Sequence, residues 1–244
     1  MGRDEALARW LIDAIKRLGD VSDNEVELRR HILSTYLWMR KGMLLIALAF
    51  PVVLWIGGWA FHGLSLKDSM SAYYWEPIVK GEEGGDAPMR VWFVGLLFAL
   101  GTCLVLYKGY TRLEDRLLNV AGIFAIGVAL FPMCWEIACP SWGLHYIFAV
   151  GFFSLLAVVA LLHGAYAWGS LRNGRRSQRL EDRPKLYAAL YVLSAVAMLI
   201  APGLTWLIFG AFWGEAVGIG AFCFFWGVQI RQIGKSQFDQ ELAK

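Results

Sequence analysis

The stretch "GMLLIALAFPVVLWIGGWAFHG", Gly42–Gly63, decides the fold class of this chain. It lies inside the longer run 42–66, which contains no Asp, Glu, Lys or Arg. About 20 apolar residues in a helix cross a hydrocarbon layer of ~30 Å, so the stretch predicts a membrane-spanning helix. The whole chain of 244 residues is 58% hydrophobic, well above the usual share in soluble proteins.

Further apolar runs repeat this signal along the chain. Residues 91–107 and 117–135 are free of charge, and a third charge-free run, 137–171, predicts a span that begins at His145. The run 186–230 contains only Glu215 and is too long for one crossing, so it must turn back. We place the turn at residues 210–214, because a turn at Pro202 would put Glu215 deep in hydrocarbon.

These runs predict an all-α protein, a six-helix transmembrane bundle with an N-terminal cytoplasmic amphipathic helix. The predicted parts are a helical extension (1–41), the six-span domain (42–233) and a cytoplasmic tail (234–244). Residues 4–19 place apolar side chains at helical spacing. Ser22 and Glu25 form a capping-box pattern that opens a second helix through residues 26–40, which is expected to run into the first span. The amphipathic helix could lie at the membrane interface, dock a partner or pack under its own bundle.

Basic residues predict the orientation of the spans. Of 23 Lys and Arg, 20 fall before the first span, after the last, or in the second and fourth loops. Cytoplasmic loops carry such an excess, so both termini are expected in the cytoplasm, with the chain in a bacterial inner membrane. The net charge of +3 then reflects topology, and no nucleic-acid partner is expected.

The segment "SMSAYYWEP", residues 69–77, follows the first span on the predicted outer side. Tyr and Trp prefer the membrane interface, which would by itself explain the aromatic residues. Polar residues from other spans and loops are predicted at the same level, however, and such groups usually face a cavity or one another. The alternative is therefore an outward-facing pocket with these candidate binding residues: His62, Ser69, Ser71, Tyr73, Tyr74, Glu76, Glu136, His145 and Glu215.

Three other patterns carry possible sites. Cys134 and Cys139 share a predicted outer loop, where they could form a disulfide, remain free thiols or bind a metal. His62, His145 and Glu215 (or Glu136) could together hold zinc, although no cofactor is the main expectation. The third pattern is a stripe of small residues that permits close helix contact, within the bundle or in a homo-oligomer: Gly210, Gly214 and Gly218.

Four segments of the chain resemble a group of uncharacterised bacterial multi-span membrane proteins. They are "SMSAYYWEP", "FVGLLFALGTCLVLYKGY", "NVAGIFAIGVALFP" and "EAVGIGAFCFFWGVQ", and the resemblance covers residues 42–233. It implies a multi-span membrane fold and no particular activity. A more distant comparison is with ceramidase and adiponectin-receptor hydrolases, which use three His. Here His145 and His163 are too far apart along one helix to share a site on one side of the membrane.

The function expected from the sequence is that of an integral membrane protein in a lipid bilayer, whose pocket binds or passes a small ligand, ion or lipid headgroup. A metal-dependent lipid hydrolase and a membrane effector or scaffold gated through the N-terminal extension are the alternatives. Whether the protein is an enzyme is left open.

Overall fold

The computed structural model describes residues 25–75, 87–133, 142–172 and 184–242. Within these ranges all regular structure is helical, which confirms the predicted all-α class. The elements are α2 (Glu25–Val52), the π-helix η1 (Val53–Gly57), α3 (Gly58–His62), the 3₁₀-helix η2 (Ser71–Tyr74), α4 (Pro88–Leu106), α5 (Arg112–Leu130), α6 (Trp142–Arg172), α7 (Pro184–Phe209) and α8 (Ala211–Leu242).

The chain divides into two units, residues 1–38 and 39–244. In the first unit only residues 25–38 are described, and they form the beginning of α2. The continuous helix α2 confirms that a helix runs from Glu25 into the first span. The predicted amphipathic helix, residues 4–19, lies outside the described residues.

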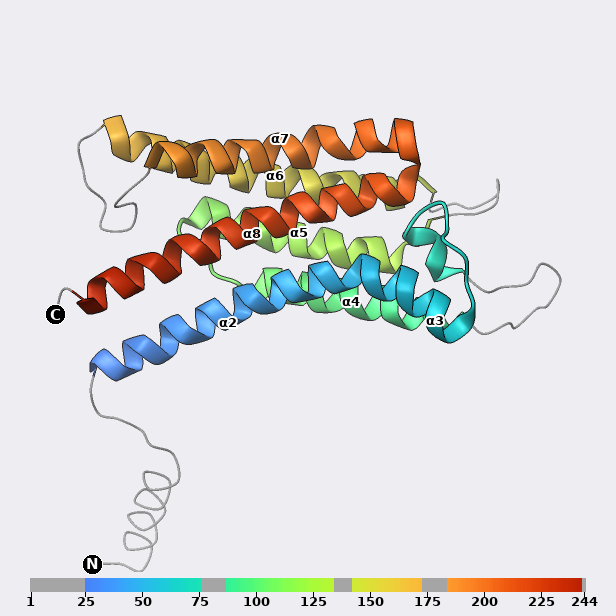
Figure 1. The fold of residues 1–244 in the computed structure, drawn as a ribbon, viewed down its shortest axis with the longest axis horizontal. Coiled ribbons are helices and arrows are strands. Elements are labelled where there is room, and N and C mark those ends of the chain that lie inside the picture. Colours follow the sequence, from blue (N-terminus) through green and yellow to red (C-terminus); the bar gives the residue numbers. More distant parts are fainter. Residues whose placement is uncertain (1–24, 76–86, 134–141, 173–183, 243–244) are drawn as a thin grey trace, which may run out of the picture. The chain divides into compact units, whose positions relative to one another are not determined.

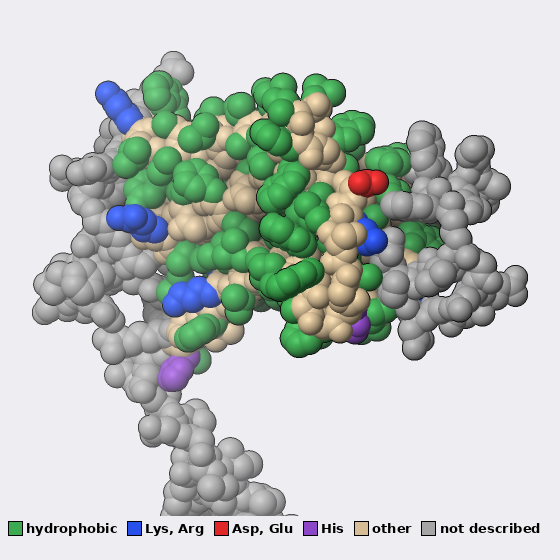
Figure 2. Space-filling view, turned by 45° about the vertical axis from the view of Figure 1, so that its right-hand side comes forward, with side chains coloured by type: hydrophobic (Ala, Val, Ile, Leu, Met, Phe, Trp, Pro, Cys, Tyr) green, Lys and Arg blue, Asp and Glu red, His purple; other side chains and the backbone are tan. Residues whose placement is uncertain are grey.

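Among the described residues, five helical segments are long and apolar enough to cross a membrane: Ser34–His62, Pro88–Leu106, Gly143–Gly169, Lys185–Phe209 and Ala211–Gln232. Hydrophobic side chains cover most of the face shown in Figure 2, and charged side chains lie toward its two ends. Apolar exposure on this scale fits contact with lipid. These features indicate an integral membrane protein.

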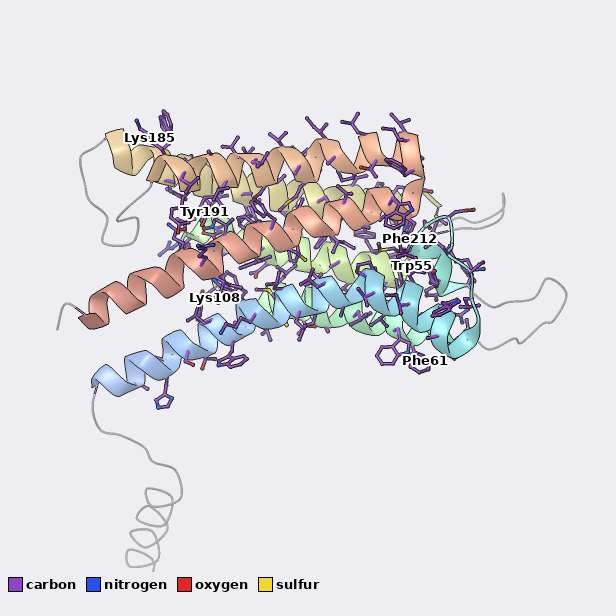
Figure 3. All side chains as sticks on the ribbon, in the orientation of Figure 1. Trp55, Phe61, Lys108, Lys185, Tyr191 and Phe212 are labelled. Carbon is purple, nitrogen blue, oxygen red and sulfur yellow. The ribbon has the colours of Figure 1, made fainter. Side chains whose placement is uncertain are left out.

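Neighbouring helices pack in chain order, α4 against α5, α5 against α6, α6 against α7, and α7 against α8 (Figure 1). Lys108 and Lys185 mark one end of the second unit, and Trp55, Phe61 and Phe212 mark the other (Figure 3). We call them the KGY end, after Lys108–Tyr110, and the SMSAYY end, after Ser69–Tyr74.

Local sequence explains where several helices begin and turn. Pro88 occupies the first turn of α4, where its missing N–H is not needed. The Thr111 side chain caps α5 by accepting a hydrogen bond from the Glu114 N–H at 3.2 Å. Gly210, at φ 94°, separates α7 from α8 and confirms the predicted turn.

The first span is not a uniform α-helix. Pro51 lies inside α2, and the chain continues as the π-helix η1 before returning to α-helix in α3. Proline removes one backbone hydrogen bond, and π-turns are a common local adjustment within helices. Because a π-turn contains more residues than an α-turn, it changes the direction of the side chains that follow, including His62.

Candidate ligand pocket

The SMSAYY segment is buried between helices. Ser69 Oγ accepts a hydrogen bond from the Ala72 N–H at 3.1 Å, and the Tyr73 N–H donates to the Met70 carbonyl at 3.2 Å. The Tyr73 side chain is 0% exposed. An interfacial belt would leave this ring in the headgroup region, whereas the Tyr73 ring is part of the hydrophobic core.

Two hydrogen bonds fix the position of the His145 ring at the start of α6. Its Nδ1 lies 2.8 Å from the carbonyl oxygen of Phe131, at the end of α5, and its Nε2 lies 3.0 Å from Ser71 Oγ. A carbonyl only accepts, so Nδ1 carries the proton. In the neutral ring Nε2 is therefore the acceptor, and the Ser71 hydroxyl donates to it. His145 and Ser71 are 3% and 5% exposed.

Glu215 connects the SMSAYY segment to the first turns of α8. Its Oε2 accepts a hydrogen bond from the Met70 N–H at 2.5 Å. Three residues earlier, the Phe212 N–H donates to the Asp68 carbonyl at 2.7 Å. Among the described residues no hydrogen bond to Glu215 Oε1 is found. The segment is thus held by α8 on one side and by His145 on the other.

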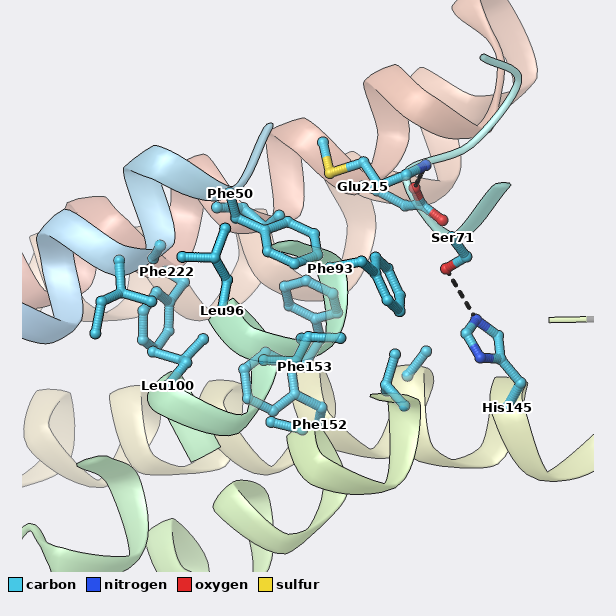
Figure 4. Close-up of a pocket in the computed structure, with 18 residues that line it drawn as sticks. Phe50, Ser71, Phe93, Leu96, Leu100, His145, Phe152, Phe153, Glu215 and Phe222 are labelled. Atoms are coloured by element: carbon cyan, nitrogen blue, oxygen red, sulfur yellow. Dashed lines mark hydrogen bonds between the residues drawn. The ribbon is translucent and has the colours of Figure 1, made fainter. Parts of the chain in front are cut away.

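These polar groups lie at one end of an apolar cavity of about 90 Å³ (Figure 4). The polar side chains of the lining are Ser71, His145 and Glu215, and the other lining residues are apolar: Ile46, Ala47, Phe50, Met70, Phe93, Leu96, Leu97, Leu100, Ala125, Val128, Ala149, Phe152, Phe153, Ile219 and Phe222. The cavity thus has a polar tip and a long apolar wall.

The structure brings three of the predicted binding residues into the cavity and places others elsewhere. His62, at the end of α3, is exposed and does not line the cavity. Ser69 is buried in the segment, and the Tyr73 hydroxyl lies 3.4 Å from the Ser65 carbonyl oxygen. The Arg90 guanidinium lies over the Tyr74 ring, with its Cζ 4.7 Å from the ring centroid. Glu76, Glu136, Cys134 and Cys139 lie outside the described residues.

Metal ligands are not gathered in the described part of the chain. No group of three His, Cys, Asp or Glu side chains there is close enough to hold a metal ion. His62, in particular, does not join His145 and Glu215 at the cavity. The two cysteines within the described residues, Cys103 and Cys223, are free thiols.

A second polar cluster, at the KGY end, was not foreseen from the sequence. His163 Nε2 lies 2.9 Å from Glu114 Oε1 and 3.1 Å from Gln229 Nε2, which links α5, α6 and α8. Glu114 Oε2 accepts a hydrogen bond from the Tyr110 N–H at 2.9 Å. In the sequence, the feature that could have indicated this cluster is His163. It is a polar residue inside a charge-free run, and such a residue needs a buried partner.

Arg40 completes this end of the molecule. Its side chain is 0% exposed and donates hydrogen bonds to the hydroxyls of Tyr107 and Tyr110. The guanidinium also lies 5.8 Å from the ring of Trp226 on α8. The KGY loop is thereby tied to both α2 and α8.

The fold and the cavity define an α-helical membrane protein with a polar-tipped apolar pocket. Comparisons with protein-family models, with curated proteins and with solved structures find no match to this chain.

Proposed function

We propose that this chain is a six-span membrane protein that binds a small amphiphilic molecule in the cavity at its SMSAYY end. The observation that carries this proposal is the composition of the cavity wall, which is apolar except for Ser71, His145 and Glu215. Ligand sites typically combine an apolar lining with a few placed polar groups.

The sixth span is α5. It is not among the five candidate spans, because Arg112, Glu114, Asp115 and Arg116 occupy its first turn. Its 19 residues extend about 28 Å, close to the hydrocarbon thickness. It also packs along both α4 and α6, which are candidate spans themselves. With α5 included, successive helices alternate in direction and the excess of basic residues falls at the KGY end, the proposed cytoplasmic side.

The polar tip favours a head group that donates hydrogen bonds. Ser71 uses its proton toward His145, so its oxygen is left as an acceptor. Glu215 Oε1 is a further acceptor that makes no hydrogen bond to the described residues. The Glu215 carboxylate would repel an anionic head group, whereas a hydroxyl or amine would donate a hydrogen bond to it. Five phenylalanines of the wall suit an alkyl chain: Phe50, Phe93, Phe152, Phe153 and Phe222.

Photolabelling of the full chain in lipid nanodiscs tests this proposal. The probe is a diacylglycerol that carries a diazirine in one acyl chain and keeps a free hydroxyl. We expect crosslinks to cavity residues, and we expect Ala149→Phe to reduce them at least about tenfold, because the larger ring fills the space of the chain.

The matched control is Val150→Phe. Val150 neighbours Ala149 but is 65% exposed on the surface of α6, so this substitution leaves the cavity unchanged. Crosslinks confined to outward-facing residues, and equal in both variants, would show that the cavity takes no acyl chain.

A further inference from the structure

The Ser71 and His145 pair has the arrangement of an activated nucleophile. We propose that Ser71 accepts an acyl group from an ester bound in the cavity, with His145 as its general base. This inference rests on the proposed function, because the acyl chain of the ester would occupy the apolar cavity.

The geometry meets the requirements of such a pair. A nucleophile and its base lie within hydrogen-bond reach, and a third group orients the base. Here Ser71 Oγ lies 3.0 Å from His145 Nε2, and the Phe131 carbonyl, 2.8 Å from Nδ1, holds the ring in the tautomer whose Nε2 accepts a proton. In Ser-His-Asp sites a carboxylate takes the orienting position, whereas a carbonyl orients the ring without a full charge.

The surroundings indicate which ester the pair would meet. Both side chains are buried and both line the cavity, so a reacting carbonyl group reaches Ser71 through the apolar space. Phe93, Phe152 and Phe222 line that space and match an alkyl chain. The substrate class is therefore an acyl ester with an apolar acyl chain.

The reaction balances without a change of oxidation state. The Ser71 hydroxyl proton passes to His145 Nε2 while Oγ bonds to the carbonyl carbon. The ester C–O bond then breaks, and the leaving alcohol takes that proton from His145. In the second half, water or another alcohol gives a proton to His145 and attacks the acyl carbon, and Oγ recovers the proton as the acyl–Oγ bond breaks.

An alkyl fluorophosphonate tests the proposal, since it phosphonylates activated serines. The purified full chain in nanodiscs is treated with this reagent, and the modified residue is found by peptide mass spectrometry. We expect one adduct on Ser71 and none in Ser71→Ala. His145→Gln keeps a hydrogen-bonding group but removes the base, so it should slow labelling at least about a hundredfold. His145→Asn serves if that variant does not fold.

Ser194→Ala is the matched control. Ser194 is buried on α7, its Oγ donates to the Leu190 carbonyl oxygen at 2.8 Å, and it does not line the cavity, so labelling should match that of the unmodified sequence. No adduct on Ser71, or labelling at an unchanged rate in both His145 variants, would overturn the inference. If cavity photolabelling persists in that case, the binding function stands without the reaction. If cavity photolabelling is also lacking, the proposed function fails as well.

Discussion

At the scale of single residues, Glu114 is a buried carboxylate whose two oxygens both accept hydrogen bonds at the KGY end. It is 1% exposed and accepts hydrogen bonds from the Tyr110 N–H and, at its other oxygen, from the ring of His163. Loss of one partner leaves the remaining buried polar groups unsatisfied, which costs more than the net value of the hydrogen bond itself.

We therefore predict that Glu114→Ala lowers the free energy of unfolding by about 3 kcal/mol. Glu114→Gln keeps an acceptor and should lose less. The control is Asp115→Ala, because the partly exposed Asp115 carboxylate pairs at 3.4 Å with the exposed Lys108 and accepts a long hydrogen bond, 3.3 Å, from the Gly109 N–H. Such surface pairs contribute about 1 kcal/mol or less. The midpoint of SDS-induced unfolding in mixed micelles measures each change, and equal losses at positions 114 and 115 would contradict the prediction.

Individual residues of the pocket were only partly predictable. Ser71, His145 and Glu215 were found because polar groups at the ends of apolar spans need a common partner or cavity. His62 has the same sequence signature but lies at the end of α3, where residues 59–63 are all exposed. The contact of Glu114 with His163 depends on how α5 and α6 are rotated toward each other, which the sequence of either helix does not specify.

At the scale of elements, the backbones of α4 and α5 approach each other closely at a pair of glycines. A Cβ atom on Gly101 would lie 2.7 Å from the Gly122 carbonyl oxygen, and one on Gly122 would lie 2.5 Å from the Gly101 carbonyl oxygen. The two backbones can approach this closely only because both residues lack a side chain.

Gly101→Ala should therefore destabilise the protein by about 1–3 kcal/mol, because the added methyl group forces the helices apart. Gly95→Ala, on the same helix, has nothing within 4 Å of the added Cβ and should be neutral or slightly stabilising. Thermal unfolding of both variants in the same detergent gives the comparison. A Gly101→Ala variant as stable as Gly95→Ala would show that α4 and α5 do not pack in this way.

The glycine stripe of α8 shows why helix positions were easier to predict than helix contacts. Its spacing indicated a close contact, and the structure places Gly214 against the Pro202 carbonyl of α7 and Gly218 against Phe153 of α6. The turn at Gly210 was predictable from chain length and the position of Glu215. The choice of α6 and α7 as neighbours required the three-dimensional packing, and a homo-oligomer through this stripe stays a prediction.

At the scale of the whole molecule, the main prediction is that α5 crosses the membrane and that the KGY end is cytoplasmic. A reporter fused after Gly174 should then lie in the cytoplasm, and one fused after Gly84 should lie outside. The reason is the distribution of Lys and Arg, 20 of 23 of which fall on one predicted side.

Green fluorescent protein and alkaline phosphatase fusions at both positions provide the readout, since each is active on only one side of a bacterial inner membrane. With α5 as a span, three crossings separate Gly84 from Gly174. If α5 does not cross, two crossings separate them, and both fusions report the same compartment. That result would exclude the six-span arrangement. The apolar runs of the sequence were sufficient to predict a membrane protein. They were not sufficient to predict whether α5 crosses the membrane, because its first turn is charged.

The central claim is that a polar-tipped apolar cavity within the bundle holds an amphiphile. It is tested most directly by a cryo-electron microscopy map of the full chain in nanodiscs, bound to a rigid antibody fragment that adds mass. We predict elongated non-protein density along Phe93 and Phe152, with one end beside Ser71 and His145. A map in which side chains fill this space, or in which His145 and Glu215 face bulk solvent, would contradict the claim.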